Sequence, residues 1–182
     1  MNNCWVTFFS QSGKEIMDLS EMIRRIPDRI ITNKRPEHLR KIDERIPRDR
    51  LFYTANKPAL EEYYRLIFDY SNPLVTLHGW LRIIPEEISS VYRVYNGHPG
   101  LVDLYGEKLK GFNAQERVVG KKEEYPLIGS IIHRVTPELD SGEILESVRV
   151  ENTTETIDQA YEILRKTSLR SWFNFMKFNE NK

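Results

Sequence analysis

The first half of the chain alternates between short apolar runs and longer amphipathic stretches, and this alternation constrains the fold more than any other feature. Runs rich in β-branched and aromatic residues, typical of strands, occur at 5–9, 29–32, 51–53 and 73–77. Stretches with apolar residues every three or four positions, typical of amphipathic helices, occur at 14–26 and 60–70. Strands that alternate with helices favour βαβ units. The sequence therefore predicts an α/β fold with a mostly parallel sheet and helices on both faces.

The second half predicts further strands and a long closing helix. Strand candidates lie at 92–95, 128–135 and 144–150, and an amphipathic helix is expected at 156–178. The last strands could pair differently from the others. A charged stretch with a thin apolar stripe predicts a surface helix at 36–46. With 182 residues, 40% of them apolar, the chain has the size of a single domain covering 1–182.

Composition excludes several classes of protein. Lysine plus arginine and aspartate plus glutamate each number 27, so no net field attracts a nucleic-acid backbone or an anionic membrane. No apolar run reaches the ~20 residues that a membrane span requires, and no charged segment leads into an apolar one at the N-terminus. The single cysteine, Cys4, rules out an internal disulfide or a multi-cysteine zinc site. We therefore expect a cytoplasmic protein without nucleic-acid or membrane partners.

Ligands of parallel α/β sheets bind beyond the carboxyl ends of the strands, which directs attention to the loops at 10–13, 96–100 and 136–142. In the second loop, Asn96 and His98 follow directly after a strand. An amide NH2 can hydrogen-bond an oxygen that becomes negative, and an imidazole exchanges protons near neutral pH, so both suit acyl transfer. The alternative is an ordinary Asn-Gly turn with a surface histidine.

Asp140 of the third loop is similarly ambiguous, because Asp-Ser-Gly is common turn chemistry. Together with an imidazole from another loop, its carboxylate could hold a charged histidine in place or receive a proton through a water. His133 lies seven positions earlier, on the preceding strand. A half-buried strand histidine is an equally good interpretation of His133.

Five segments, taken in order, resemble a known family. They are Ser-Gly after the first strand, His78 to Ile84, Asn96-Gly97-His98-Pro99, Gly129 to His133, and Glu138 to Gly142. Their order and separations resemble the folate-dependent formyltransferases, most of all the glycinamide ribonucleotide formyltransferases of purine biosynthesis. The resemblance extends from about Val6 to the final helix. It implies the fold of those enzymes, a Rossmann-like three-layer sandwich.

The resemblance assigns the chemistry residue by residue. Asn96, His98 and Asp140 match the family's catalytic asparagine, histidine and aspartate, and His133 matches a supporting histidine. The implied reaction is attack of an amine on the formyl carbon of 10-formyltetrahydrofolate, a co-substrate. Asn96 and protonated His98 would stabilise the oxyanion, while Asp140 would hold His98 and help to move the proton through water. No metal is implied, and the partners are the folate and a small-molecule amine.

Binding residues follow from the same resemblance. Those implied for folate are Leu81, Arg82, Ile83 and Ile84, whose backbone lines the pterin pocket, and Glu138 and Leu139 on the other wall. Arg82, Ile83 and Ile84 are also compatible with core and rim positions. The phosphate of the amine is expected at Ser12, Gly13 and Lys14, where the start of a helix suits an anion.

Departures from the family's pattern concern the amine. Glu15 replaces an asparagine of the phosphate loop, and its carboxylate repels a phosphate unless Lys14 offsets it. Gly100 and Asp103 stand where the family usually has serine and a second proline, and a glutamate of the last helix is replaced near Arg165. Another phosphorylated or nucleotide-linked amine is therefore a serious alternative.

Four interpretations follow. The first is a formyltransferase for glycinamide ribonucleotide or a similar amine, and the second is an N-formyltransferase for a nucleotide-linked amino sugar. The third is a formyltetrahydrofolate hydrolase, although that family has an extra N-terminal domain and here the first strand starts within a few residues. The fourth is a non-catalytic folate-binding relative, against which the intact Asn96, His98 and Asp140 argue. The neutral charge disfavours a methionyl-tRNA formyltransferase.

Overall fold

Two units make up the structure, a computed structural model that describes residues 4–35, 37, 41–68 and 70–180. The first unit comprises the residues up to 96 together with 135–137, and the second comprises 97–134 and the residues from 138 onward. Each unit has a hydrophobic core of its own. The boundary at Asn96 and Gly97 falls inside the segment that is expected to carry chemistry.

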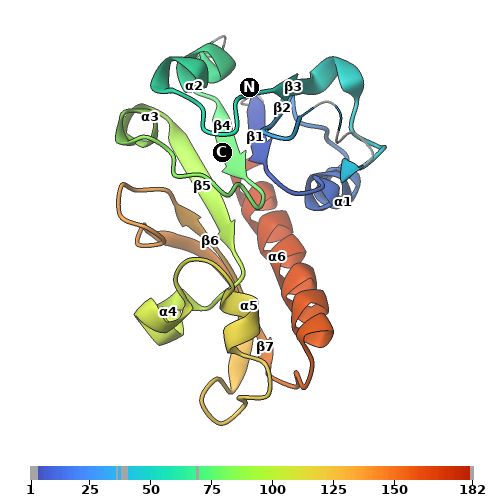
Figure 1. Cartoon of the computed structure of the whole chain (residues 1–182), viewed down its shortest axis with the longest axis vertical. Coiled ribbons are helices and arrows are strands. Elements are labelled where there is room, and N and C mark those ends of the chain that lie inside the picture. The colour runs from blue at the N-terminus through green and yellow to red at the C-terminus, as the bar shows by residue number, and fades with distance from the viewer. Residues whose placement is uncertain (1–3, 36, 38–40, 69, 181–182) are drawn as a thin grey trace. The chain divides into compact units, whose positions relative to one another are not determined.

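The first unit is built on a parallel sheet. Its strands are β1 (Trp5–Phe9), β2 (Arg29–Thr32), β3 (Leu51–Tyr53), β4 (Leu74–Leu77) and the part of β5 (Arg93–His98) up to Asn96. Their order is β3-β2-β1-β4-β5, and each neighbouring pair is parallel. Figure 1 shows β4 and β5 side by side and running in the same direction. The parallel sheet expected from the apolar runs is confirmed.

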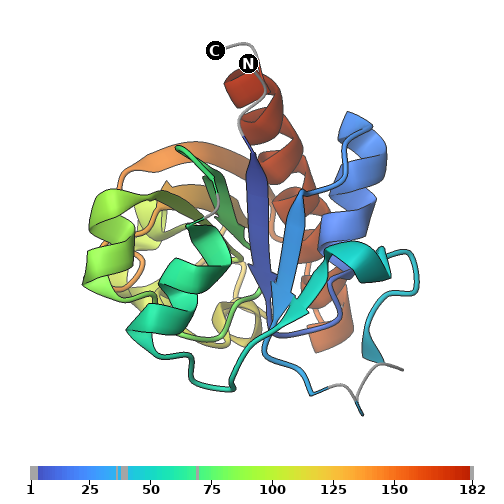
Figure 2. The same cartoon turned by 90° about the horizontal axis from the view of Figure 1, so that it is seen from above.

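Helices cover both faces of this sheet. Successive residues of a strand point to opposite faces, so Phe8 and Phe9 of β1 belong to different cores. Phe9 packs with α1 (Lys14–Ile23), whereas Phe8 packs with α2 (Leu60–Ile67) and α3 (Glu86–Val91). Figure 2 shows α1 and α2 on opposite sides of β1 and β2. The helices on both faces explain why the strands read as continuous apolar runs.

The second unit combines an antiparallel strand pair with a long helix. β6 (Leu127–Arg134) pairs with β7 (Ile144–Glu151), and α6 (Ile157–Glu180) packs against both strands (Figure 1). The hydroxyl of Ser130 in β6 donates a hydrogen bond to the Leu164 carbonyl of α6 at 3.1 Å. The antiparallel pairing agrees with the expectation that the last strands differ from the others.

Three short helices of the second unit precede β6. They are α4 (Val102–Tyr105), the 3-10 helix η3 (Gly106–Leu109) and α5 (Ala114–Arg117). Sequence patterns do not predict them, because four residues are too few to show an amphipathic period. Leu109 at the end of η3 nevertheless packs in the core of this unit with Tyr125, Ile128 and Leu164.

The strand that carries Asn96 is longer than expected. β5 continues to His98, and Asn96 pairs in register with Leu77 of β4. The expectation that Asn96 and His98 lie in a loop after the strand is therefore wrong. Pairing along the neighbouring strand outweighs the local preference of Asn-Gly for a turn.

The structure also differs from the sequence prediction at two helix ends and at one expected helix. α1 ends at Ile23 because Arg24 adopts a left-handed conformation (φ 57°) and its N–H bonds to the Ser20 carbonyl. α2 ends at Ile67. Of the helix expected at 36–46, residues 36 and 38–40 lie outside the described residues, and 42–46 forms turns and bends, preceding the 3-10 helix η2 (Arg48–Arg50). Within the described part of the chain, no helix is long and apolar enough to cross a membrane.

Candidate active site

His98 ends β5 and is only 5% exposed. Its Nε2 donates a hydrogen bond to the Leu109 carbonyl, 2.6 Å away. Because a carbonyl oxygen only accepts, Nε2 carries a proton. The other ring nitrogen, Nδ1, lies 3.4 Å from Oδ2 of Asp140. Both nitrogens of His98 therefore face hydrogen-bond acceptors.

Asp140 lies in the loop between β6 and β7 and is 8% exposed. Its φ of 49° is left-handed, a conformation that aspartate adopts more readily than most side chains. Oδ2 accepts a hydrogen bond from the Gly111 N–H at 2.8 Å, and Oδ1 lies 3.4 Å from Nε2 of His133. The carboxylate is thus enclosed by two imidazoles and a main-chain donor.

β6 supplies His133, which is buried. Its Nδ1 donates to the Arg134 carbonyl at 3.0 Å, while its Nε2 faces Asp140. The pairing of β6 with β7 shifts register between Ile132 and His133, and such irregularities redirect side chains. The structure therefore brings His98, Asp140 and His133 together as one buried cluster of the second unit.

Charges in this cluster follow from its contacts. Burial raises the pKa of Asp140, but the hydrogen bond from His133, the charge of His98 and the Gly111 N–H outweigh burial and hold this pKa at about 2. Burial lowers the pKa of His98, although Asp140 and the Leu109 carbonyl act in the opposite direction. At neutral pH the carboxylate is therefore charged and the His98 imidazole is mainly neutral. A proton added to His98 meets an acceptor at each nitrogen.

A guanidinium holds the loop that supplies the main-chain groups of the cluster. Arg117 donates hydrogen bonds to three carbonyls of this loop, at Lys108 (2.9 Å), Lys110 (2.8 Å) and Phe112. The Leu109 carbonyl and the Gly111 N–H lie between these anchored positions. The sequence does not reveal the roles of Leu109, Gly111 and Arg117. Leu109 and Gly111 contact the cluster through main-chain groups, which every residue has, and Arg117 in turn binds main-chain carbonyls. Only Gly111, with a φ of 74°, carries a signal, since glycine suits this conformation.

Asn96 belongs to the first unit and lies two positions before His98 on β5. It pairs with Leu77 of β4, and its side chain is partly exposed. Residues two positions apart on a strand point to the same side of that strand.

The segment expected to bind folate, 81–84, follows β4 in the first unit. The Leu81 N–H donates to the Ser10 hydroxyl at 3.1 Å. Ile83 is 78% exposed, whereas Ile84 is 4% exposed and packs in the core. The side chain of Ile84 thus has a core position, which leaves its backbone for the expected pterin contact. In the second unit, Glu138 and Leu139 are both exposed in the loop before Asp140.

Local contacts account for the side chains of the loop after β1, where a phosphate is expected. Gly13 has a φ of 74°, and the Lys14 N–H bonds to the Ser12 hydroxyl at 3.3 Å. Glu15 Oε2 accepts a hydrogen bond from Nδ1 of His78 at 2.9 Å. The Lys14 ammonium pairs with Asp18 at 3.2 Å. The Glu15 carboxylate thus contacts an imidazole, while the ammonium of Lys14 contacts Asp18.

The two departures after His98 have structural roles in the second unit. A Cβ atom at Gly100 would lie 3.0 Å from Nε2 of His98 and 3.1 Å from the Leu109 carbonyl oxygen. A glycine at this position therefore leaves room for the contact between His98 and Leu109. Asp103 pairs with Arg149 of β7 at 2.5 Å and accepts a hydrogen bond from Ser147. Arg165 lies exposed on α6.

Among the described residues, no three His, Cys, Asp or Glu side chains are arranged to hold a metal ion. The lone Cys4 is partly buried, and burial and Asp28 raise the pKa of its thiol to about 12. This thiol is therefore protonated at neutral pH and a poor nucleophile.

Comparison with known proteins gives one sequence match. Residues 6–171 match the profile of the formyl transferase family. None of the curated proteins compared with the chain matches it. The family match covers both units and includes all residues of the buried cluster.

Solved structures give a consistent fold. Phosphoribosylglycinamide formyltransferase of Anaplasma phagocytophilum is similar with a TM-score of 0.76 and 21% identity over 97% of this chain and 86% of that one. A formyltetrahydrofolate deformylase of Pseudomonas syringae has a TM-score of 0.76 and 20% identity over 94% and 59% of the chains. A sugar N-formyltransferase of Shewanella has a TM-score of 0.68 and 21% identity over 94% and 67%. The expected Rossmann-like α/β fold is confirmed.

Proposed function

Because the chain belongs to the formyl transferase family, we propose that it transfers the formyl group of 10-formyltetrahydrofolate to a primary amine, with Asn96, His98 and Asp140 at the reaction centre. The observation that carries this proposal is the buried contact between His98 and Asp140. Burial of a carboxylate costs stability unless it is compensated, and perturbed groups of this kind gather at functional sites. The donors around Asp140 compensate its burial, so the contact is compatible with the fold, and the shifted pKa values of both groups favour a role in chemistry.

The proposed reaction moves one formyl group and one proton. The amine nitrogen attacks the formyl carbon, the formyl oxygen becomes an oxyanion, and the bond from the formyl carbon to N10 of the folate then breaks. The Asn96 amide donates to the oxyanion. When the Leu109 carbonyl no longer holds the proton on Nε2, the neutral imidazole carries its proton on Nδ1, toward Asp140. Nε2 of His98 then takes the proton from the amine and returns it to N10. In between, His98 is an imidazolium, and the Asp140 carboxylate balances its charge.

Leu109 affects how His98 meets its substrate. Its carbonyl accepts the Nε2 hydrogen bond of His98 in this structure. A reacting atom that uses Nε2 therefore displaces this carbonyl. Arg117, which anchors the flanking carbonyls, keeps the displaced loop close to the cluster.

For the folate, we assign the main chain of 81–84 and the residues Glu138 and Leu139, following the resemblance. For the amine, the best candidate is glycinamide ribonucleotide or a similar phosphorylated amine, which would place the enzyme in purine biosynthesis. One observation favours the second candidate, a nucleotide-linked amino sugar. Glu15 and His78 bring a carboxylate to the loop where the ribonucleotide phosphate is expected.

An acceptor screen tests the proposed function. The purified protein is given 10-formyltetrahydrofolate with glycinamide ribonucleotide, with a nucleotide-linked amino sugar, or without any amine, and tetrahydrofolate formation is followed. We expect turnover only when an amine is present. Turnover without an amine identifies a hydrolase, and no turnover with folate still bound identifies a non-catalytic relative.

A further inference from the structure

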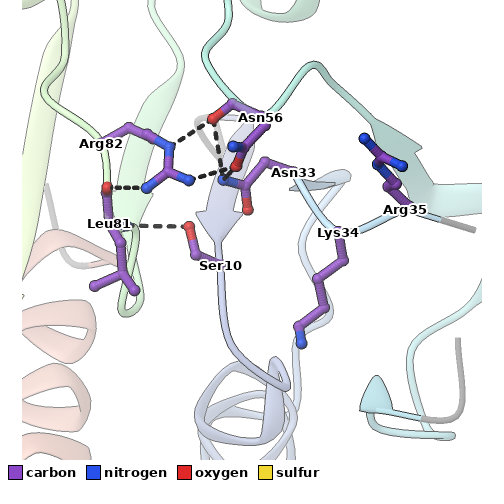
Figure 3. A pocket seen from close by; sticks show the side chains of 7 residues that line it. All are labelled: Ser10, Asn33, Lys34, Arg35, Asn56, Leu81 and Arg82. Carbon is purple, nitrogen blue, oxygen red and sulfur yellow. Dashed lines mark hydrogen bonds between the residues drawn. The ribbon is translucent and has the colours of Figure 1, made fainter. Parts of the chain in front are cut away.

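The first unit contains a cavity of about 290 Å³. Two of its lining residues, Leu81 and Arg82, belong to the segment whose main chain is assigned to the folate, and the proposed reaction gives the other lining residues and the Arg82 side chain no role. It is lined by Ser10, Asn33, Lys34, Arg35, Asn56, Leu81 and Arg82. Figure 3 shows Arg82, Asn56, Asn33 and Ser10 gathered together, with Lys34 and Arg35 on the loop beside them. Binding pockets for whole small molecules occupy roughly 300 to 1,000 Å³. A cavity of this size therefore fits one group of a substrate better than a complete substrate.

Its place in the sheet is the one where α/β proteins bind ligands. Ser10 follows β1, Asn33 to Arg35 follow β2, Asn56 follows β3, and Leu81 and Arg82 follow β4. The strand order changes direction between β1 and β4. Ligands of such sheets bind beyond the carboxyl ends of the strands at this switch point. The cavity therefore lies at the carboxyl ends of the strands and next to the switch point between β1 and β4.

Charge selects the kind of group that the cavity accepts. Three lining residues are cations, Lys34, Arg35 and Arg82, and none is an acid. Arg35 has an exposed partner, Glu37, at 3.7 Å. Within the described ranges, Lys34 and Arg82 have no carboxylate partner. A group with two or more negative charges, such as a phosphate or diphosphate, matches this lining better than a single carboxylate.

Hydrogen bonds already orient the Arg82 guanidinium. Its Nε donates to the Asn56 carbonyl, its Nη2 donates to the Asn56 side-chain oxygen, and its Nη1 donates to the Leu81 carbonyl. A guanidinium that is held in place loses less conformational entropy when it binds an anion. Asn33 donates to the same Asn56 side chain at 3.4 Å. Asn56 therefore connects the loops after β2, β3 and β4.

The loop after β1 offers an anion much less. There the Glu15 carboxylate lies in the first turn of α1, and the nearby ammonium of Lys14 contacts Asp18. A phosphate at Gly13 would lie close to that carboxylate and be repelled by it. Positive charge is instead concentrated after β2 and β4, at Lys34, Arg35 and Arg82.

We propose that this cavity is an oxyanion subsite that binds the phosphate of the amine substrate. The subsite replaces the loop of Ser12, Gly13 and Lys14 in that role. Only the identity of the bound substrate rests on the proposed function, because the anion affinity of the cavity is measurable without turnover.

The first experiment measures binding of inorganic pyrophosphate by calorimetry. Wild type is compared with the double variant Lys34→Met, Arg35→Met and with Lys14→Met, which removes a cation from the loop after β1. Hydrogen bonds to charged groups account for about a tenfold change in affinity or more. We expect the double variant to lose at least tenfold in affinity and Lys14→Met to bind like wild type. Loss in Lys14→Met with binding retained in the double variant overturns the proposal.

The second experiment separates the two sources of an oxyanion, since folate also carries carboxylates on its glutamate. The amine that is active in the screen is titrated at saturating 10-formyltetrahydrofolate, and the folate is then titrated at saturating amine. In the double variant we expect KM to rise about tenfold for the amine and little for the folate. A rise for the folate alone overturns the assignment to the amine. Pyrophosphate binding in a protein that never transfers formyl groups contradicts the proposed function and leaves the subsite intact.

A matched lysine controls for the change in net charge. Lys57 is exposed next to Asn56 but does not line the cavity. Lys57→Met should bind pyrophosphate within about twofold of wild type. Equal losses in Lys57→Met and the double variant indicate a general field effect and overturn the subsite.

Discussion

Nδ1 of His98 lies 3.4 Å from Oδ2 of Asp140, and neither residue is more than 8% exposed. Despite burial, the donors around Asp140 keep its carboxyl ionised, whereas burial keeps His98 mainly neutral at pH 7. The pair is therefore an anion beside a neutral base. A proton that reaches His98 converts this pair into an ion pair, which is the change that the proposed proton relay requires.

Replacement of Asp140 by asparagine removes the charge and keeps the size of the side chain. The imidazolium of His98 then loses its counter-ion, so we expect kcat to fall by roughly 10²- to 10⁴-fold. Folate affinity should change little, because the Asp140 side chain affects proton transfer rather than folate binding. Steady-state kinetics and a folate titration measure both quantities. Asp103→Asn is the matched control, since Asp103 pairs with Arg149 outside the cluster; near-normal kcat in Asp140→Asn contradicts the site assignment.

Acid should destabilise the protein through Asp140. Its pKa is about 2 in the folded protein, against about 3.9 in an unfolded chain. A carboxyl whose folded pKa is depressed stabilises the fold above its unfolded pKa. This contribution, on the order of 2 kcal/mol, is lost as the pH falls from about 4 to about 2. Urea unfolding across this window should show a weaker pH dependence for Asp140→Asn than for wild type; equal slopes would argue against an ionised Asp140.

His98 also predicts a loss of stability on acidification, in a range of pH above that of Asp140. Because burial places its folded pKa below the unfolded value of about 6.5, the unfolded chain takes up the proton first. The free energy of unfolding should therefore decrease as the pH falls below about 6.5. His98→Gln removes this titration, so its unfolding free energy should vary less between pH 7 and 5. Wild type that becomes more stable on acidification would show that the cluster favours the imidazolium.

Much of the fold follows from local patterns in the sequence. The run 5–9 and the centre of the run 29–32 are largely apolar because α1 and α2 cover both faces of the sheet, and such runs stand out without an alignment. Asn96 is the opposite case. Its local turn preference is overridden by pairing with Leu77, a residue far away in the sequence.

The site divides in the same way. His98, His133 and Asp140 are visible in the sequence because their side chains have distinctive chemistry. The Leu109 carbonyl and the Gly111 N–H are invisible, since every residue has such groups and only the folded loop places them. Sequence patterns therefore indicate the side chains of this buried cluster and miss the main-chain groups that contact it.

Arg117 tests the importance of that main-chain half. Arg117→Lys keeps the charge, but one ammonium lacks the fork of donors that reaches carbonyls on both sides of Leu109. We expect kcat to fall about tenfold and hydrogen exchange at 106–112 to become faster. The acid limb of the pH profile for kcat/KM should also shift, because the Leu109 carbonyl influences the pKa of His98. Lower thermal stability with an unchanged pH profile would assign Arg117 a purely structural role.

Two glycines of the second unit predict an order of destabilisation. A Cβ atom at Gly129 would lie 1.9 Å from the Val148 carbonyl oxygen, and one at Gly97 would lie 2.5 Å from Nε1 of Trp172. The Val148 carbonyl belongs to β7, so it cannot move without disturbing the pairing of β6 with β7. Trp172 is fully buried, but a side chain can shift slightly. We therefore expect Gly129→Ala to lower the free energy of unfolding by more than about 3 kcal/mol and Gly97→Ala to lower it by about 1 to 3 kcal/mol, as measured by urea unfolding.

A double variant tests the explanation for Gly97. Trp172→Phe should lower the free energy of unfolding less in the Gly97→Ala background than in wild type, because it relieves the clash. Additive effects of the two changes, or a smaller loss for Gly129→Ala than for Gly97→Ala, would contradict this explanation.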